Sequence, residues 1–144
     1  MGPTFPEIPE MRLVLDTNLL VSALLKPGSV PSRLLAAIWE KATVLYDARI
    51  ADEYREVLMR PKFRAIERPH IEGFLATLEA RGQRLGEVAV WDGTMKDDDD
   101  RIFVEVALAG RADAIVTGNL RDYPTDLGFS VHPPATLLAL LEVA

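Results

Sequence analysis

Met11-Arg12-Leu13-Val14-Leu15 is an apolar run that stops abruptly at Asp16-Thr17-Asn18. A short, continuously apolar run of this kind is typical of a strand buried in a parallel sheet. Open α/β sheets bind their ligands beyond the carboxyl ends of the strands, which is where Asp16 stands. We therefore expect acidic residues from later in the chain to meet Asp16 there and to form a metal site.

The composition fits one globular domain. The chain has 144 residues, of which 49% are hydrophobic, and a domain of this length buries about 70% of its unfolded surface. The formal charge of -6 and the pI of about 4.9 argue against a protein that holds nucleic acid by bulk positive charge. Divalent cations in an acidic pocket would change its local charge, so an RNA or DNA substrate is still compatible with this composition.

The sequence contains no cysteine, which leaves no disulfide, thiolate zinc site or cysteine nucleophile and suits a reducing cytosol. No stretch approaches the roughly 18 apolar residues that cross a bilayer, and the first residues lack the order of a secretory signal. We expect a cytoplasmic protein without a membrane segment. It would have an extended, proline-containing arm over residues 1–10 and a single domain over residues 11–144.

Predicted strands and helices alternate along the chain. The strands are expected at residues 11–15, 43–46, 84–90, 114–116 and 129–131. The helices are expected from Thr17 to the stop at Lys26-Pro27-Gly28, from Pro31 past Ile38, and over residues 50–59, 69–82, 99–109 and 134–142. This order predicts a three-layer α/β/α sandwich around a central, mainly parallel sheet.

Asp16 has two compatible interpretations. Its side chain can cap the helix that begins at Thr17. It also lies at the exit of an apolar strand beside other strand exits, where an unpaired charge would be destabilising, and this favours a functional role.

Four consecutive aspartates, Asp97 to Asp100, repel one another unless a cation or a helix amino terminus absorbs their charge. Asp100 is the one expected to point inward, because it shares a helix face with Phe103. Asp99 is an alternative cap for this helix, and Asp97 and Asp98 are equally well explained as solvated charges.

Other polar candidates have ordinary alternatives. Glu53 lies in the first turns of a helix, where an acid stabilises the helix dipole. Asn119 and Asp122 follow the strand at residues 114–116 and are common turn formers, and Thr117 is explained as a cap.

Side-chain oxygens in this number suit Mg²⁺ or Mn²⁺ better than zinc. These ions bind phosphate oxygens, align a water for in-line attack and neutralise the leaving oxygen, which indicates phosphodiester hydrolysis. His70 and His132 do not support a histidine acid–base pair.

Four segments resemble the PIN domain family of metal-dependent ribonucleases, which includes the VapC-type toxins of prokaryotic toxin–antitoxin modules. They occur in family order over most of the chain, at residues 13–18, 53–63, 97–107 and 115–124. The resemblance implies a metal pocket of three catalytic acids and a fourth polar position, with polar supporting residues: Asp16, Glu53 and Asp100, then Asn119 or Asp122, with Asn18, Thr117, Asp97 and Asp99 in support.

The chain departs from the family pattern at one position. Many relatives carry aspartate directly after the Thr-Gly pair, where this sequence has Asn119. Either Asp122 completes the site or a second metal ion is weakly held, because asparagine carries no charge.

The resemblance implies a Mg²⁺- or Mn²⁺-dependent endoribonuclease that cleaves RNA. It also implies a toxin whose cognate antitoxin covers or enters the acidic cleft, and a homodimer. The alternative is a catalytically weak PIN-like module that binds RNA or protein. The densest basic set for RNA contact surrounds Phe63 and consists of Arg60, Lys62, Arg64 and Arg68, although a solvated helix end explains these residues too. Arg60, Lys62 and Arg64 are the RNA-binding candidates.

Two other acidic α/β classes fit poorly. A phosphoryl-accepting receiver domain needs adjacent acids after the first strand and a lysine after a late one. A haloacid-dehalogenase-like phosphatase needs a second aspartate where Asn18 stands.

Overall fold

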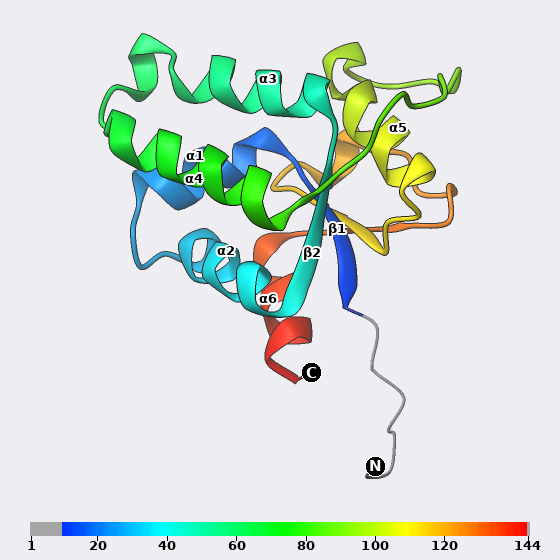
Figure 1. Ribbon diagram of the computed structural model, residues 1–144. Helices are drawn as coiled ribbons and strands as arrows, with labels where there is room; N and C mark the ends of the chain where they lie inside the picture. Colours follow the sequence, from blue (N-terminus) through cyan, green and yellow to red (C-terminus); the bar gives the residue numbers. More distant parts are fainter. Residues whose placement is uncertain (1–9, 144) are drawn as a thin grey trace, which may run out of the picture.

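The computed structural model describes residues 10–143 (Figure 1). Within this range, five strands form one sheet in the order β3-β2-β1-β4-β5, and every neighbouring pair is parallel. The expected amino-terminal arm lies outside the described residues, except for Glu10. The strands are β1 Met11–Leu15, β2 Ala42–Tyr46, β3 Gln83–Arg84, β4 Ala114–Val116 and β5 Ser130–His132.

Helices cover both faces of the sheet. Figure 1 shows α5 on one side of the sheet and α1, α2 and α4 on the other, which confirms the three-layer prediction. The α-helices are α1 Thr17–Leu25, α2 Val30–Lys41, α3 Ala48–Leu58, α4 Arg68–Arg81, α5 Arg101–Ala109 and α6 Pro134–Val143. Three short 3-10 turns are η1 Pro61–Phe63, η2 Asp98–Asp100 and η3 Leu120–Asp122.

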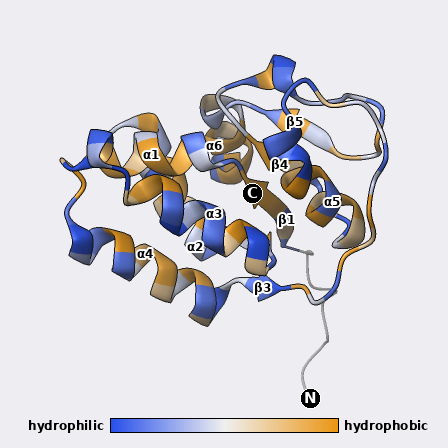
Figure 2. Ribbon diagram, turned by 90° about the horizontal axis from the view of Figure 1, so that it is seen from above, coloured by the Kyte–Doolittle hydropathy of each residue, from blue (hydrophilic) through white to orange (hydrophobic). Residues whose placement is uncertain are grey.

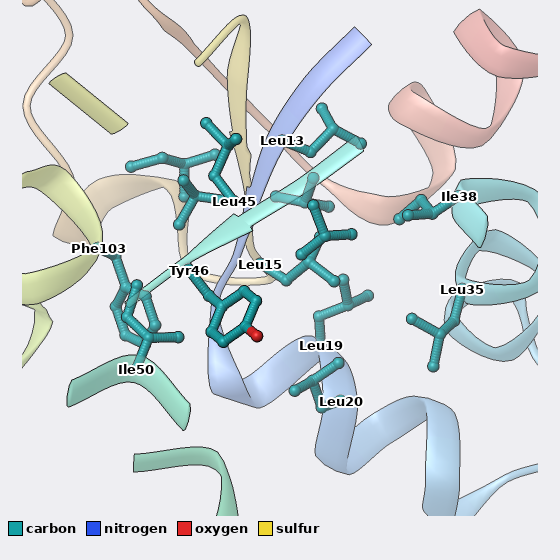
Figure 3. Close-up of a cluster of buried hydrophobic side chains, with 14 of the residues drawn as sticks. Leu13, Leu15, Leu19, Leu20, Leu35, Ile38, Leu45, Tyr46, Ile50 and Phe103 are labelled. Carbon is teal, nitrogen blue, oxygen red and sulfur yellow. The ribbon is translucent and has the colours of Figure 1, made fainter. Parts of the chain in front are cut away.

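The core lies between the sheet and these helices. Leu13 and Leu15 of β1, Leu20 of α1 and Ile38 of α2 are fully buried and gather around the sheet (Figure 3). The helices show hydrophobic and hydrophilic sides in Figure 2, as expected for helices that cover a sheet. Burial of each such aliphatic side chain contributes about 1.5–3 kcal/mol, so the central strands are held firmly.

The predicted strand at residues 84–90 is wrong beyond its first residue. β3 pairs only with Leu45 and Tyr46, where β2 ends, so the backbone after Arg84 has no neighbouring strand to continue the ladder. Val90 is 85% exposed, so the apolar residues of this segment do not form a buried strand face.

Two strand ends are held side by side. The amide of Asp16 donates to the carbonyl of Val116 at 2.9 Å, and the amide of Thr117 donates to the carbonyl of His132 at 3.0 Å. The residues that follow β1 and β4 therefore start from one edge of the sheet, as the parallel topology requires. Between residues 10 and 143, no helix is long and apolar enough to cross a membrane.

Candidate active site

Asp16 is 6% exposed and lies in the turn from β1 to α1. Its Oδ2 accepts a hydrogen bond from Thr117 Oγ1 at 2.8 Å and another from the Tyr123 hydroxyl at 2.9 Å. Its Oδ1 accepts from the Asn18 amide at 3.3 Å, which makes Asp16 the cap of α1. Asp16 is thus both a helix cap and the centre of a buried polar cluster.

Asn18 joins the two strand ends. Its Nδ2 lies 3.4 Å from both Asp16 Oδ2 and Thr117 Oγ1, and its Oδ1 accepts from the Gly118 amide at 3.2 Å. Both hydrogen-bonding ends of this amide are therefore used, which holds the loop after β4 against the first turn of α1. The expected supporting positions Asn18 and Thr117 meet Asp16 as the sequence suggested.

Asp100 is half-buried between η2 and the start of α5. Its pKa is raised to about 7, first by burial and then by the negative charges of Asp16, Asp97, Asp122 and Glu53. Like charges raise the pKa of a carboxylate in this way only when they lie nearby. Three acids from distant parts of the chain, Asp16, Glu53 and Asp122, are therefore near Asp100, together with its sequence neighbour Asp97.

Glu53 lies on α3 at the border of this group. Burial is the main cause of its raised pKa, and the charge of Glu56 adds to it, whereas Arg60 acts in the opposite direction. The charges of Asp99 and Asp16 raise it further. We call Asp16, Glu53, Asp100 and Asp122 the acidic cluster.

Of the two candidates for the fourth position, Asp122 is the one whose charge acts on Asp100. Asp122 contributes to the raised pKa of Asp100, and its Oδ1 lies 3.4 Å from Lys96 Nζ. Asn119 is exposed, and its backbone amide donates to Thr117 Oγ1 at 3.0 Å. Its uncharged side chain cannot replace an aspartate electrostatically.

Within the run of four aspartates, the capping residue is Asp97. Its Oδ1 accepts from the Asp99 amide at 3.0 Å, so the alternative of Asp99 as the cap is wrong. The reason is the short η2 turn, which starts the helical segment before α5. Asp98 forms an ion pair with Arg101 at 2.8 Å, and its side chain is 82% exposed.

Sequence reasoning assigned no role to Tyr123. Its side chain is 5% exposed, and its pKa is raised first by burial and then by the charges of Asp16 and Asp100, so the hydroxyl remains a donor. The available signal is an aromatic residue directly after Asp122, within an otherwise polar loop.

The basic set lies beside η1, next to the Glu53 side of the cluster. Arg60 forms an ion pair with Glu56 at 2.8 Å, and Lys62 Nζ lies 5.0 Å from the centre of the Phe63 ring. Arg64 is exposed. Two of the three cations thus already have a partner.

The donor chemistry fits a hard divalent cation, because Asp16 and Asp100 form no ion pair with any residue between 10 and 143. Their arrangement is open: among the described residues, no three Asp, Glu or His side chains form a ready metal-binding group. Ligation would therefore require carboxylates of the cluster to move closer together.

The site and fold define a PIN domain. The model of this family matches residues 12–121, so the chain belongs to the PIN domain family, whose members are generally nucleases. It is similar to the uncharacterized protein MJ1680 of Methanocaldococcus jannaschii, with 27% identity over 113 residues that cover 76% of this chain and 72% of that protein.

A solved structure shares the fold. It is the crystal structure of VapBC2 from Rickettsia felis bound to a DNA fragment from their promoter. The similarity has a TM-score of 0.57 with 17% sequence identity, and it covers 85% of this chain and 98% of the other. At this identity the comparison supports the architecture alone.

Proposed function

We propose that this protein is a Mg²⁺- or Mn²⁺-dependent endoribonuclease that hydrolyses RNA phosphodiester bonds. Membership in a nuclease family supports the general activity. The observation that carries the proposal is that Asp16 is buried, Asp100 is half-buried, and the two are near enough for the charge of Asp16 to raise the pKa of Asp100. Neither forms an ion pair with any residue from 10 to 143. A buried acid without a cationic partner destabilises the folded state, and such acids are typical of ligand-binding sites, where a bound cation neutralises them.

The residues that would hold the ion are the acidic cluster, with Asn119 as a further oxygen donor. When bound, such an ion neutralises charge on the phosphate and lowers the pKa of an attacking water. Thr117 and Tyr123 both donate to Oδ2 of Asp16, which orients this carboxylate. Oδ1 then remains the freer oxygen for a ligand.

RNA is the proposed substrate, and Arg60, Lys62 and Arg64 are proposed to contact its backbone. Exchange of Lys62 and Arg64 for glutamate should weaken RNA binding, since each lost phosphate contact reduces affinity and its salt dependence. Unchanged affinity would remove this set from the proposal.

The likeness to VapC-type toxins and the fold shared with VapBC2 support a toxin whose partner is an antitoxin. In this proposal the antitoxin covers or enters the acidic cleft, and the toxin is a homodimer. A co-purified partner that blocks cleavage, together with the mass of the isolated protein in solution, would test both parts.

Asp16→Asn tests the catalytic proposal most directly. Wild type and variant are incubated with a mixed RNA pool and Mn²⁺, and the fragment ends are mapped. We expect cleavage to fall by about 10³-fold or more, because the amide of asparagine has nearly the same shape as the carboxylate but lacks its negative charge. Asp126→Asn, at an exposed loop residue outside the cluster, is the matched control and should cleave normally. Full cleavage by Asp16→Asn would refute the proposal.

The second candidate is a binding module with weak catalysis. It is favoured by one observation, the exposed and uncharged Asn119 where many relatives carry aspartate. RNA binding without any cleavage, even at high Mn²⁺ concentration, would support this function over the first.

A further inference from the structure

A surface groove runs beside the acidic cluster. One part is a hollow of about 400 Å³ lined by Lys96, Gly118, Asn119, Leu120, Arg121 and Asp122. A second hollow of about 190 Å³ is lined by Asn18, Leu19, Ser22, Pro31, Gly118, Asn119 and Pro134. Gly118 and Asn119 border both hollows, so the two lie next to each other. We call them together the loop groove.

The loop groove adjoins the centre of the site. Asn18 lines it and contacts Asp16, and Asp122 of the acidic cluster lines its other part. Gly118 forms an open part of the floor, since a Cβ added there would meet only Asn18 Oδ1, at 3.9 Å. A chain lying in this groove would pass directly beside the acidic cluster.

The groove carries two cations that are available to a ligand. The side chain of Lys96 is 68% exposed, and its ion pair with Asp122 is 3.4 Å long. Such an exposed pair contributes only about 0–1 kcal/mol, so the ammonium can leave it for a stronger anion. Arg121 is exposed and forms no ion pair with any residue from 10 to 143.

These cations and the basic set at η1 adjoin different acids of the cluster. Arg60 lowers the pKa of Glu53, whereas Lys96 pairs with Asp122. Glu53 and Asp122 both contribute to the raised pKa of Asp100. In a protein with a charge of -6, local cations beside an acidic site can hold a polyanion next to it.

We propose that the loop groove is the path of the RNA backbone, in which Lys96 exchanges Asp122 for a substrate phosphate and Arg121 binds a neighbouring phosphate. This inference rests on the proposed ribonuclease function and adds a binding site to it. Release of Asp122 from Lys96 would also free that carboxylate for the acidic cluster.

Equilibrium binding of a fluorescent single-stranded RNA tests the path. All proteins carry Asp16→Asn to prevent cleavage, and affinity is measured over a series of salt concentrations. One protein adds Lys96→Gln and Arg121→Gln, another adds Lys62→Gln and Arg64→Gln, and a control adds Arg81→Gln and Arg111→Gln, at exposed positions outside both the loop groove and the basic set at η1. Each pair removes two positive charges, so the comparison is matched.

We expect the Lys96 and Arg121 pair to weaken binding by about tenfold or more and to reduce the salt slope by about 1.4, the value for two phosphate contacts to a single strand. The control pair, Arg81 and Arg111, should change neither value appreciably. An equal effect of the Lys96 and Arg121 pair and the control pair, or normal binding without Lys96 and Arg121, would overturn the path.

A parallel cleavage assay of the wild-type protein separates the two levels of the proposal. If the wild-type protein cleaves RNA and the variant without Lys96 and Arg121 still binds RNA normally, the proposed path is refuted and the proposed nuclease function stands. A wild-type protein that neither binds nor cleaves RNA refutes the proposed function, and the path with it.

Discussion

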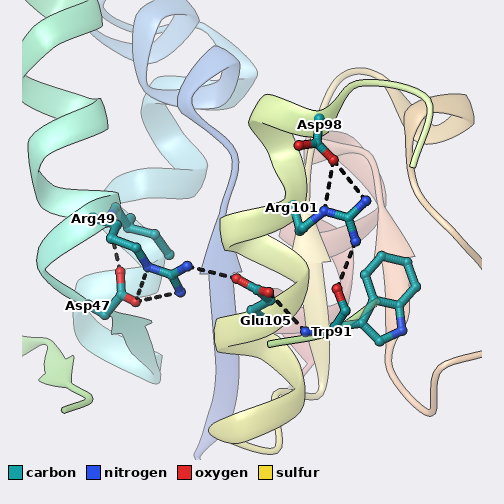
Figure 4. A network of polar contacts seen from close by, with 7 residues as sticks. Asp47, Arg49, Trp91, Asp98, Arg101 and Glu105 are labelled. Carbon is teal, nitrogen blue, oxygen red and sulfur yellow. Dashed lines mark hydrogen bonds and ion pairs between the residues drawn. The ribbon is translucent and has the colours of Figure 1, made fainter. Parts of the chain in front are cut away.

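Two groups of buried or half-buried acids in this protein differ in what surrounds them. Asp47 and Glu105, which are 4% and 5% exposed, share Arg49, at 2.8 and 2.7 Å (Figure 4). Burial alone would raise the pKa of Glu105, but the bonds from Arg49 and the Trp91 amide hold it below its usual value. In the acidic cluster, like charges and burial instead raise the pKa of Asp100 to about 7.

The paired acids hold the structure together. Glu105 accepts from the Trp91 amide at 2.9 Å, and the carbonyl of Trp91 accepts from Arg101 at 2.8 Å (Figure 4). These bonds fasten the irregular segment before α5, which leads into the aspartate run. The contrast teaches that the buried carboxylates of the structural pair are neutralised by an arginine, whereas the carboxylates of the proposed metal site are surrounded by hydroxyls and other acids.

The largest effect on stability is expected from Glu105→Gln. The variant weakens the bonds to Arg49 and Trp91, and we expect the free energy of unfolding to fall by about 1–3 kcal/mol while RNA cleavage changes little. Denaturant unfolding measures the first quantity and a cleavage assay the second. Glu142→Gln is the control, because its ion pair with Arg33 is 3.7 Å long and exposed, and it should change stability by at most about 0.5 kcal/mol. If Glu105→Gln lost cleavage but kept its stability, Glu105 would act in the reaction and not in holding the fold.

A smaller effect is expected from Tyr123→Phe, which removes one donor to Asp16. Cleavage and Mn²⁺ affinity should fall about tenfold, and stability by about 1 kcal/mol, because a buried acceptor loses one of its partners. Tyr54→Phe is the matched control, since that hydroxyl donates to the carbonyl of Leu15 and not to Asp16. Metal titration and unfolding of both variants distinguish the two roles. Equal losses of Mn²⁺ affinity would show that Tyr123 has no special role at Asp16.

The smallest expected effect is a pH-dependent change in the stability of the Asp100→Asn variant, measured without metal. The pKa of Asp100 rises from 3.8 to about 7 on folding, so the folded state binds more protons than the unfolded state between these values. The contribution of Asp100 to stability therefore falls as pH rises from about 4 to 7.

The amide that replaces this carboxyl group does not titrate, so Asp100→Asn should be more stable than the wild type at about pH 8 and lose this advantage toward about pH 4. We expect a gain in Tm of about 2–4 °C at the higher pH, the shift that about 1 kcal/mol produces after discounting for solvent screening. Unfolding in the presence of a chelator measures it. A difference that does not vary with pH would argue against repulsion within the acidic cluster.

Local patterns in the chain were sufficient for most of the fold. The apolar run at residues 11–15 and the helical spacing that follows it predicted β1 and α1, because burial selects these periodicities directly. The same patterns placed Asp16 at a strand exit. They failed at residues 84–90, because a strand there would need β2 as its neighbour and β2 ends at Tyr46.

Residue types and their order were thus enough to anticipate the α/β layers and the acids that could gather at the sheet edge. Which acids acquire a partner was settled by folding, because those contacts join residues far apart in the chain. Arg49 and Glu105 are 56 positions apart, and Tyr123 reaches Asp16 across 107. Hydrogen bonds and charges act over a few ångströms in space, so no local pattern distinguishes Glu105, which is neutralised by arginine, from Asp100, which is not.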